Sequence, residues 1–232
     1  MIFTNDIMKR SKGRKDGERM KALLIANGTV ENTEFYQKRL QKEKFGLVVC
    51  ADGGIANAKR LGIRPDFIIG DFDSIDQETL KVYRRDGVSI ERHLPEKDET
   101  DTELALQFIL NKGADSIVML GCTGSRFDHT LANVYLLKEL LKHQVEGVIV
   151  DPHNEIRMID KTMVLTDKEN QTISLLPVEE KAEGITLEGF QYPLKDETLR
   201  QGLSRGISNK ITASRAVIDF KKGLLLVIEA KD

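Results

Sequence analysis

Two aspartates, Asp71 and Asp73, follow the apolar run DFIIG in the sequence IIGDFDSI. On an extended chain, side chains two residues apart point to the same side, and like charges placed so repel unless a cation or water separates them. Carboxylate oxygens suit Mg²⁺, which commonly binds one or two of them together with substrate phosphates. The alternative, a helix cap supplied by Asp73 or Ser74, leaves Asp71 unexplained. We therefore interpret the pair as metal ligands.

A second cluster, Asp52-Gly53-Gly54, follows the apolar run GLVVCA. Paired glycines let the backbone approach a ligand closely, and they expose amide groups at the start of the next helix. Taken alone, Asp52 also fits an ordinary helix cap beside a tight turn. Both interpretations stay open at this point.

A third cluster, KDETD at residues 97–101, precedes an amphipathic helical pattern. Thr100 and Glu103 have the spacing of a capping box, and acidic residues suit the positive end of a helix. These effects are a sufficient structural account of the cluster alone. They do not explain why Lys97 and Asp98 occupy the same turn.

The fourth cluster, GCTGSRFDH at residues 121–129, joins an apolar run to a long helical pattern. A glycine loop that leads into a helix can bind phosphate, here through Gly124 and Ser125, and Arg126 adds a bidentate donor. Neither GxxxxGK[ST] nor GxGxxG is present. His129 is a general base, a phosphate donor or a structural residue, and Asp128 can brace the loop by a local hydrogen bond.

Between residues 21 and 151, apolar strand-like runs alternate with helical patterns, which favours an α/β fold with an open, mostly parallel sheet and helices on both faces. Strands are expected at 21–27, 46–51, 66–70, 88–92, 116–121 and 146–151. Helices are expected at 32–44, 53–62, 76–87, 100–113 and 127–143. Ligands bind such sheets beyond the carboxyl ends of the strands, which is where three of the four clusters fall.

After Pro152 the chain is rich in short β patterns, which predicts a C-terminal antiparallel β-sandwich. These patterns cover 154–160, 171–177, 184–190, 206–212, 215–220 and 223–231. Residues 220–224 are expected to form a hairpin turn with Gly223 at positive φ. We therefore expect a flexible extension at 1–19 (or a biological start at Met20), an α/β domain at 20–151 and a β-sandwich domain at 152–232.

Composition excludes several classes of protein. The chain has 232 residues and a formal net charge of -2, without the basic excess of a general nucleic-acid binder. Its two cysteines, Cys50 and Cys122, lie in apolar runs and form no CxxC pair, so buried reduced thiols are expected. No apolar run approaches the ~18 residues of a membrane span, and the N-terminus lacks the apolar centre of a signal peptide. A cytoplasmic protein is expected.

Taken in order, these clusters resemble those of the thiamine pyrophosphokinase family. The resemblance runs from Met20 to the C-terminus and rests on ADGG, GIRPDFIIGDFDSI, KDETD, GCTGSRFDHTLAN, GITLEGFQYPL and the SN of GISNKI. It implies an enzyme that transfers a diphosphate from ATP to the hydroxyl of thiamine, giving thiamine diphosphate and AMP. It also implies that the domain at 20–151 is catalytic and binds ATP and Mg²⁺, and that the sandwich at 152–232 binds thiamine. It further implies a homodimer whose active site is shared between subunits, with thiamine held partly by the sandwich of the partner.

The resemblance further implies roles for individual residues. Asp71, Asp73 and Asp101 would hold Mg²⁺ with Asp98 close by, Lys97 and Arg126 would offset developing charge, and Asp71 or Asp98 would take the hydroxyl proton. The nucleotide and phosphate region would be lined by Asp52, Lys97, Thr100, Arg126, Asp128 and His129. Ser208 and Asn209 match the motif on the thiamine side.

Three alternatives remain open from the sequence. One keeps the chemistry but uses another acceptor, such as a hydroxymethylpterin. Another is a nucleotide-sensing module that binds ATP without transfer, and the last is a metal-dependent phosphohydrolase with water as nucleophile. The chain after SN runs KITASRAVIDF and contains no tryptophan. If relatives stack thiamine on an aromatic residue there, this chain must use another contact.

Overall fold

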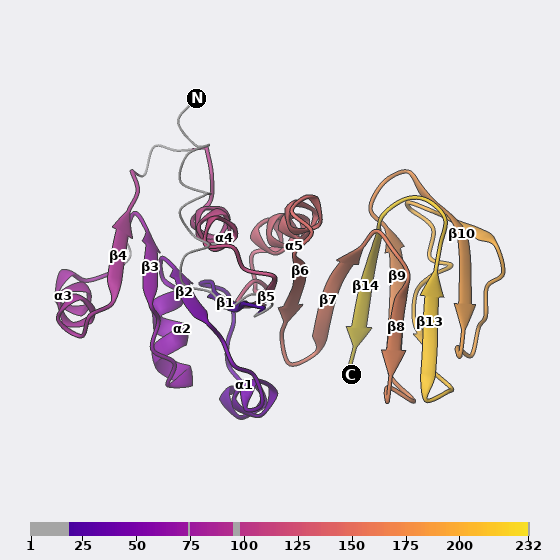
Figure 1. Ribbon diagram of the computed structural model, residues 1–232, viewed down its shortest axis with the longest axis horizontal. Helices are drawn as coiled ribbons and strands as arrows, with labels where there is room; N and C mark the ends of the chain where they lie inside the picture. Colours follow the sequence, from indigo (N-terminus) through magenta and orange to yellow (C-terminus); the bar gives the residue numbers. More distant parts are fainter. Residues whose placement is uncertain (1–18, 74, 95–97, 232) are drawn as a thin grey trace. The chain divides into compact units, whose positions relative to one another are not determined.

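The structure is a computed structural model that describes residues 19–73, 75–94 and 98–231 (Figure 1). These residues form two compact units, divided between Asp151 and Pro152. The expected N-terminal extension, residues 1–19, lies outside the described residues except for Arg19.

The first unit contains a parallel sheet with the strand order β4-β3-β2-β1-β5-β6. Its strands are β1 (Lys21–Ile25), β2 (Leu47–Ala51), β3 (Phe67–Gly70), β4 (Ser89–Arg92), β5 (Ser116–Leu120) and β6 (Glu146–Val150). The central strands are buried on both faces, with Leu24 and Met119 paired and fully buried. Continuous apolar runs are typical of parallel strands covered by helices, so the predicted α/β class is confirmed.

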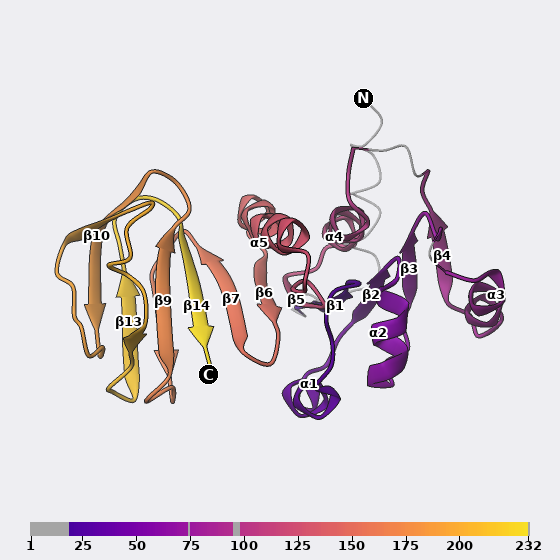
Figure 2. The same cartoon turned by 180° about the vertical axis from the view of Figure 1, so that it is seen from behind.

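Helices cover both faces of this sheet. They are α1 (Thr33–Leu40), α2 (Gly54–Leu61), α3 (Gln77–Arg85), α4 (Asp101–Asn111) and α5 (Phe127–Lys142). Figures 1 and 2 show α4 and α5 on one side and α1 and α2 on the other. Asn32, Asp76 and Thr100 cap α1, α3 and α4 by accepting backbone hydrogen bonds, which fixes where these helices begin.

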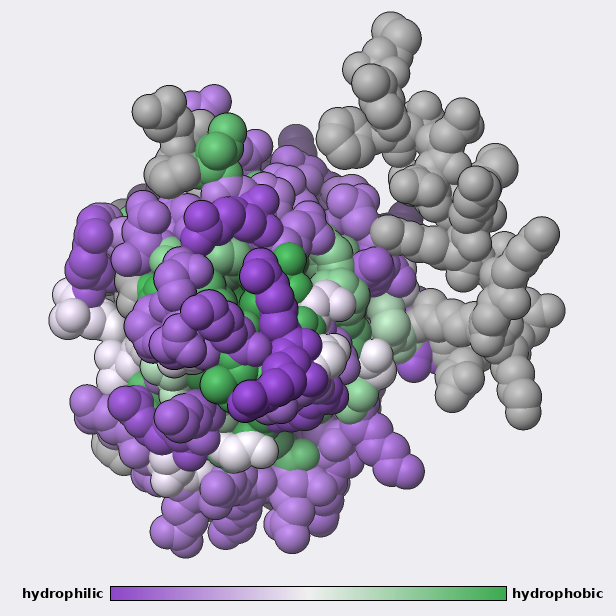
Figure 3. Space-filling model, turned by 90° about the vertical axis from the view of Figure 1, so that its left-hand side faces the viewer, coloured by the Kyte–Doolittle hydropathy of each residue, from purple (hydrophilic) through white to green (hydrophobic). Residues whose placement is uncertain are grey.

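Helix α3 packs beside the edge strand β4. Among its residues Leu80 is buried, whereas most of the others are exposed. Figure 3 views the molecule from the α3 side and shows a largely hydrophilic surface with small apolar areas between polar groups. This edge therefore presents an ordinary solvated face.

The second unit is built from two antiparallel sheets, with the orders β12-β9-β14-β7 and β11-β10-β13-β8. Its strands are β7 (Asn154–Ile159), β8 (Met163–Thr166), β9 (Thr172–Pro177), β10 (Lys181–Glu188), β11 (Glu197–Arg200), β12 (Asn209–Lys210), β13 (Arg215–Asp219) and β14 (Leu225–Ala230). Apolar side chains of both sheets, including Leu175, Ile218 and Val227, form one core. The predicted C-terminal antiparallel domain is confirmed.

The hairpin predicted at residues 220–224 is wrong. Strand β13 pairs with β10 and β8, whereas β14 pairs with β7 and β9, so the two strands lie in different sheets. Gly223 does have a φ of 109°, but it serves a connection between the sheets. Two short strands, β8 and β11, were not predicted.

Candidate active site

A cleft of about 750 Å³ lies at the carboxyl ends of the parallel strands. It is lined by residues 26–31 after β1, Asp52 after β2, Asp71 after β3, residues 99–102 at the start of α4, and residues 121–126 after β5. Strand β1 lies between β2 and β5. The chain continues from β1 to β2 on one side of this point and from β5 to β6 on the other, so the direction of strand order reverses here. Such a switch point is the usual ligand site of an open parallel sheet.

Backbone hydrogen bonds join the two loops at this switch point. The amides of Gly28 and Thr29 donate to the carbonyls of Gly121 and Thr123 at 2.6 and 2.8 Å. A Cβ atom on Gly28 would lie 2.3 Å from the Thr123 carbonyl oxygen, which is far inside van der Waals contact. Glycine is therefore required for the loops to meet, and their contact fixes one wall of the cleft.

Three half-buried carboxylates, those of Asp52, Asp71 and Asp101, meet at the edge of this cleft. One oxygen from each lies within 4.8 Å of the others. They come from the ends of β2 and β3 and from the first turn of α4. An all-oxygen donor set of this kind fits a hard cation such as Mg²⁺, and the mutual repulsion of the carboxylates favours cation binding.

Asp73 does not belong to this group, although the sequence suggested it as a partner of Asp71. Phe72 has a φ of 64°, so the chain turns instead of staying extended. The Asp73 amide donates to Oδ1 of Asp71 at 3.0 Å, and the Asp73 side chain is exposed. The structure thus brings Asp52 to Asp71 where the sequence suggested Asp73.

Gly53 and Gly54 bring the chain close to itself. A Cβ on Gly53 would lie 2.4 Å from the Asn27 side chain, and one on Gly54 would lie 2.1 Å from the Ile25 carbonyl oxygen. Neither glycine lines the cleft. Their small size lets α2 begin directly against the end of β1, and this contact places Asp52 beside the cleft.

The start of α4 contributes Thr100 and Asp101 to the cleft. Thr100 caps the helix, accepting from the Glu103 amide at 3.2 Å, which is half of the predicted capping box. The Glu103 carboxylate instead accepts a hydrogen bond from Gln107. Asp98 is exposed and does not line the cleft, and Lys97 lies outside the described residues.

The loop after β5 brings Gly124, Ser125 and Arg126 to the cleft, and the first turn of α5 adds His129. The guanidinium of Arg126 donates to both carboxylate oxygens of Asp128, at 3.2 and 2.5 Å, and this holds the pKa of Asp128 at about 2. The Gly124 amide donates to the Thr130 hydroxyl, so that amide is used within the loop. Arg126 and its neighbours remain largely exposed, with 70% of the arginine side chain accessible.

Two buried asparagines that the sequence analysis did not single out hold the cleft loops. Asn57 donates to the carbonyls of Ala26 and Gly28, both at 2.9 Å, and Asn133 donates to the Cys122 carbonyl at 2.9 Å. Burial of an amide is favourable only when its hydrogen bonds are made. The strand-end rule applied to KALLIANGT would have indicated the loop after β1, but nothing in the sequence marked Asn57.

Ser208 and Asn209 lie in the second unit. Ser208 is exposed with a φ of 55°, and its amide donates to the Ser174 hydroxyl at 3.0 Å. Asn209 is buried, and its side chain bonds to the backbone of Tyr192 and Lys210. The amide of Asn209 is therefore engaged by the protein itself.

The two cysteines are buried and free, as expected. Burial raises the pKa of each thiol to about 12, so both are protonated at neutral pH and neither is a nucleophile. Separately, none of the helices within the described residues is long and apolar enough to cross a membrane.

Fold and site together define an α/β protein with a ligand cleft at the switch point of a parallel sheet, followed by a β-sandwich. Residues 37–149 match the family model "Thiamin pyrophosphokinase, catalytic domain", and residues 159–225 match "Thiamin pyrophosphokinase, vitamin B1 binding domain". The thiamine pyrophosphokinase of Bacillus subtilis is 34% identical over 188 residues, which are 80% of this chain and 88% of that protein. A relative from Caenorhabditis elegans is 26% identical, over 72% of this chain and 71% of its own length.

Solved structures of this family resemble the chain in fold. The crystal structure of thiamine pyrophosphokinase from Bacillus subtilis superposes with a TM-score of 0.80 at 30% identity, covering 91% of this chain and 99% of its own. The enzyme of Geobacillus thermodenitrificans gives a TM-score of 0.78 at 30% identity, over 92% and 98% of the two chains. This chain belongs to the thiamin pyrophosphokinase family, and the family predicted from the sequence is confirmed.

Proposed function

We propose that this protein transfers the diphosphate group of ATP to the hydroxyl of thiamine, giving thiamine diphosphate and AMP. The observation that carries the proposal is the group formed by Asp52, Asp71 and Asp101 at the switch-point cleft of a member of this family. Polyphosphate is highly charged, and a site that binds it with a divalent cation needs hard oxygen ligands.

Mg²⁺ is the proposed cofactor, with Asp52, Asp71 and Asp101 as its ligands. When bound, the ion would neutralise charge on the polyphosphate oxygens and orient them. Asp73 is exposed outside the group, but its amide bonds to the Asp71 carboxylate. Its proposed role is therefore to orient Asp71 through the backbone.

The proposed transfer forms a bond between the thiamine hydroxyl oxygen and the β-phosphorus of ATP. The bond from that phosphorus to the oxygen bridging to the α-phosphate breaks, and AMP leaves with the bonding electrons. The hydroxyl proton goes to a carboxylate. Asp71 lines the cleft and Asp98 does not, which favours Asp71 as the acceptor. Holding both reactants in line supplies much of the rate enhancement.

Positive side chains are proposed to stabilise the charge that develops on the phosphates. Arg126 lines the cleft, where its guanidinium is paired with Asp128. Binding of a phosphate would offer Arg126 a second acceptor for its remaining donors. His129 also lines the cleft and is proposed as a phosphate donor, together with Ser125. Gly124 lines the same part of the cleft, but its amide donates to Thr130, so its proposed role is to let the phosphate approach the backbone. Lys97 keeps the role that the family resemblance implies.

The family resemblance also supports a homodimer with an active site shared between subunits, in which the sandwich unit binds thiamine. Size-exclusion chromatography with light scattering would give the mass in solution, and a monomer that is active at nanomolar concentration would contradict the shared site. A cytoplasmic location is part of the same proposal.

A product assay tests the function. The protein is incubated with ATP and Mg²⁺ in three reactions, with thiamine, with a hydroxymethylpterin or without an acceptor. AMP, ADP, phosphate, diphosphate and the mono- or diphosphorylated acceptor are resolved by chromatography. Thiamine-dependent AMP in equal amounts with thiamine diphosphate is expected. AMP formed with the pterin but not with thiamine would show that the acceptor is a pterin. Release of phosphate or diphosphate without an acceptor would indicate a hydrolase. ATP that is bound but not converted would indicate a sensing module.

A further inference from the structure

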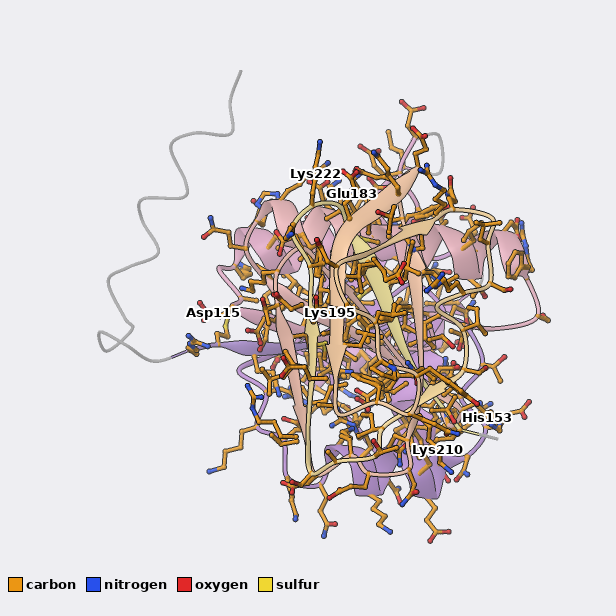
Figure 4. The ribbon with its side chains drawn as sticks, turned by 90° about the vertical axis from the view of Figure 1, so that its right-hand side faces the viewer. Asp115, His153, Glu183, Lys195, Lys210 and Lys222 are labelled. Carbon is orange, nitrogen blue, oxygen red and sulfur yellow. The ribbon has the colours of Figure 1, made fainter. Side chains whose placement is uncertain are left out.

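A site that recognises a particular ligand needs side chains whose orientation is fixed by packing and hydrogen bonds. The labelled lysines of the second unit do not meet this requirement. Figure 4 shows Lys195, Lys210 and Lys222 at separate places on that unit, and each of them is exposed. A buried carboxylate of the first unit, that of Asp151, meets the requirement and lies behind the wall of the cleft.

Asp151 follows β6 and is the last residue of the first unit. It is 9% exposed and does not line the cleft. The hydroxyl of Thr123, which does line the cleft, donates to Oδ2 of Asp151 at 3.0 Å. Burial, and after it the negative charge of Asp151, raises the pKa of Tyr36, a fully buried residue of α1. A ligand in the cleft therefore meets Thr123 and not Asp151.

The backbone around Thr123 is also held. The Thr123 carbonyl accepts from the Thr29 amide at 2.8 Å, and the carbonyl of Cys122 accepts from the buried side chain of Asn133 at 2.9 Å. The hydroxyl of Thr123 is thus fixed both through its backbone and through its bond to Asp151. Its orientation toward the cleft is set before any ligand binds.

This orientation decides which ligand group the hydroxyl can take. A hydroxyl has one hydrogen to donate and two lone pairs that accept. Because the hydrogen of Thr123 is directed at the Asp151 carboxylate, lone pairs remain for the cleft. Phosphate oxygens are acceptors as well, so the hydroxyl of Thr123 does not suit them. It suits a hydrogen-bond donor of the ligand.

The place of Thr123 along the sheet edge indicates which part of ATP carries that donor. Thr123 follows β5, whereas Asp52 and Asp71 follow β2 and β3, and β1 lies between them. With neighbouring strands about 4.8 Å apart, the end of β5 lies roughly 10–14 Å from the ends of β2 and β3. The reacting phosphates and the acceptor hydroxyl must meet at the acidic group. The nucleoside is the part of ATP that extends away from it.

We propose that Thr123 accepts a hydrogen bond from the nucleoside of ATP, and that Asp151 is the positioning residue that makes Thr123 an acceptor. The inference rests on the proposed function for the identity of the nucleotide. The donor is a ribose hydroxyl or the amino group of the base, which offer the same chemistry. Within the loop after β5, Thr123 then contacts the nucleoside, while Ser125 and Arg126 contact phosphate.

Binding of nucleotide analogues to the full-length protein tests the inference. Calorimetric titrations with Mg²⁺ and without thiamine compare ATP with 2′-deoxy-ATP, 3′-deoxy-ATP and purine riboside triphosphate, each of which lacks one donor. One of these analogues is expected to bind wild type about three- to ten-fold more weakly than ATP, as the loss of one hydrogen bond predicts. That analogue identifies the donor. Equal affinities for all four nucleotides would overturn the inference.

Substitutions of Thr123 show whether this residue accepts the bond. Thr123→Val keeps the shape but removes the hydroxyl, so it is expected to lose the preference for ATP over that analogue. Thr123→Ser keeps the hydroxyl and should keep the preference. Thr162→Val is the matched control, because the Thr162 hydroxyl also donates to an aspartate, Asp219, but in the second unit. A preference that survives in Thr123→Val would overturn the inference.

Asp151→Ala tests the positioning role. Without the carboxylate, the Thr123 hydrogen can turn toward the cleft, so the preference should fall, and adding Thr123→Val should reduce it little further. A purely structural role would weaken ATP and the analogue equally and leave the preference unchanged. Thermal unfolding shows whether each variant folds. Asp151→Asn is the second variant, and its amide can donate to Thr123 as well as accept, so the preference should again fall.

Because binding is measured without thiamine, this test is separate from that of the proposed function. If wild type shows the preference and Thr123→Val loses it, but no thiamine diphosphate is made, the inference stands and the proposed transfer fails. If thiamine diphosphate is made and Thr123→Val keeps the preference, the proposed function stands and the inference is overturned.

Discussion

Gly70, the last residue of β3, leaves no room for a side chain against Asp52. A Cβ at position 70 would lie 2.9 Å from Cβ and 3.1 Å from Cα of Asp52. Strands β2 and β3 pair in parallel, and the Asp52 amide donates to the Ile69 carbonyl at 2.8 Å. The closeness of these two strand ends puts the carboxylate of Asp52 beside that of Asp71.

Gly70→Ala should therefore disturb the arrangement of Asp52, Asp71 and Asp101 more than it disturbs the fold. The added methyl group must push Asp52 or its backbone away, at a cost of about 1–3 kcal/mol in the free energy of unfolding. Turnover should fall at least about ten-fold, because displacement of a catalytic group by 1 Å is costly. Urea unfolding and steady-state kinetics measure the two effects, and turnover within two-fold of wild type would show that the contact does not position Asp52.

Removing single charges shows whether Asp52 or Asp73 is the partner of Asp71 in binding the metal. Asp52→Asn and Asp71→Asn should each lower turnover at saturating Mg²⁺ about a hundred-fold or more, since each removes a proposed ligand. Asparagine also tolerates the φ of 39° at residue 52, so the fold should survive. Activity should disappear with EDTA and return with excess Mg²⁺.

Asp73→Asn is the matched comparison, because it removes a charge beside the group and keeps the backbone amide that bonds to Asp71. It should lower turnover much less than Asp52→Asn does. A larger loss in Asp73→Asn than in Asp52→Asn would restore the Asp71–Asp73 pair that the sequence suggested.

Asn57→Ala should destabilise the cleft loop after β1. The change removes both hydrogen bonds to the carbonyls of Ala26 and Gly28 in a site where Asn57 is 4% exposed. A loss of about 2–4 kcal/mol in the free energy of unfolding is expected, with a raised KM for ATP. Asn111→Ala, at an exposed position of α4, is the control. Equal stability of the two variants would refute the role of Asn57.

The buried thiols predict a pH dependence of stability. Burial raises the pKa of Cys50 and Cys122 from 9.0 to about 12, so the folded state favours the neutral thiol. Their contribution to stability is complete below pH 9 and is lost as the pH rises from 9 toward 12, on the order of 1 kcal/mol per thiol for each pH unit.

Thermal unfolding between pH 7 and 10.5 measures this effect. Wild type should lose more stability above pH 9 than a variant with both cysteines changed to alanine, because the other titrating groups are common to both proteins. Parallel pH profiles would contradict the buried-thiol account. Native protein should also resist alkylation by iodoacetamide at pH 8, whereas unfolded protein should react.

Most of the fold could be predicted because the first unit follows strong periodic signals. The strands between Lys21 and Val150 are apolar runs, apart from the edge strand β4 with the sequence SIER. The helices between them begin at recognisable caps such as Asp76 and Thr100. The strands of the second unit were harder to predict from the sequence. Strand β11 is the polar sequence ETLR, without an alternating apolar pattern. The turn sequence at Gly223 does not distinguish a connection within one sheet from a connection between two sheets.

The sequence indicated which clusters of residues form the candidate site, but it did not indicate which carboxylates lie together in it. Carboxylates at strand ends indicated the edge of the sheet at which the cleft lies, and Asp71 and Asp101 do meet there. The choice between Asp52 and Asp73 depends on the positive φ of Phe72, a conformation that a phenylalanine does not signal in the sequence. The position of Asn209 under Tyr192 is a tertiary contact between residues 17 apart, for which the sequence carries no local mark.

The central claim is that the whole diphosphate moves in one transfer. It is tested most directly with two samples of ATP, labelled with ³²P at the β or at the γ position, incubated with Mg²⁺ and thiamine. The account predicts that both labels enter thiamine diphosphate at the same rate and that unlabelled AMP appears in equal amount. Label from the γ position alone, with labelled ADP left from the β position, would show transfer of a single phosphate and would contradict the account.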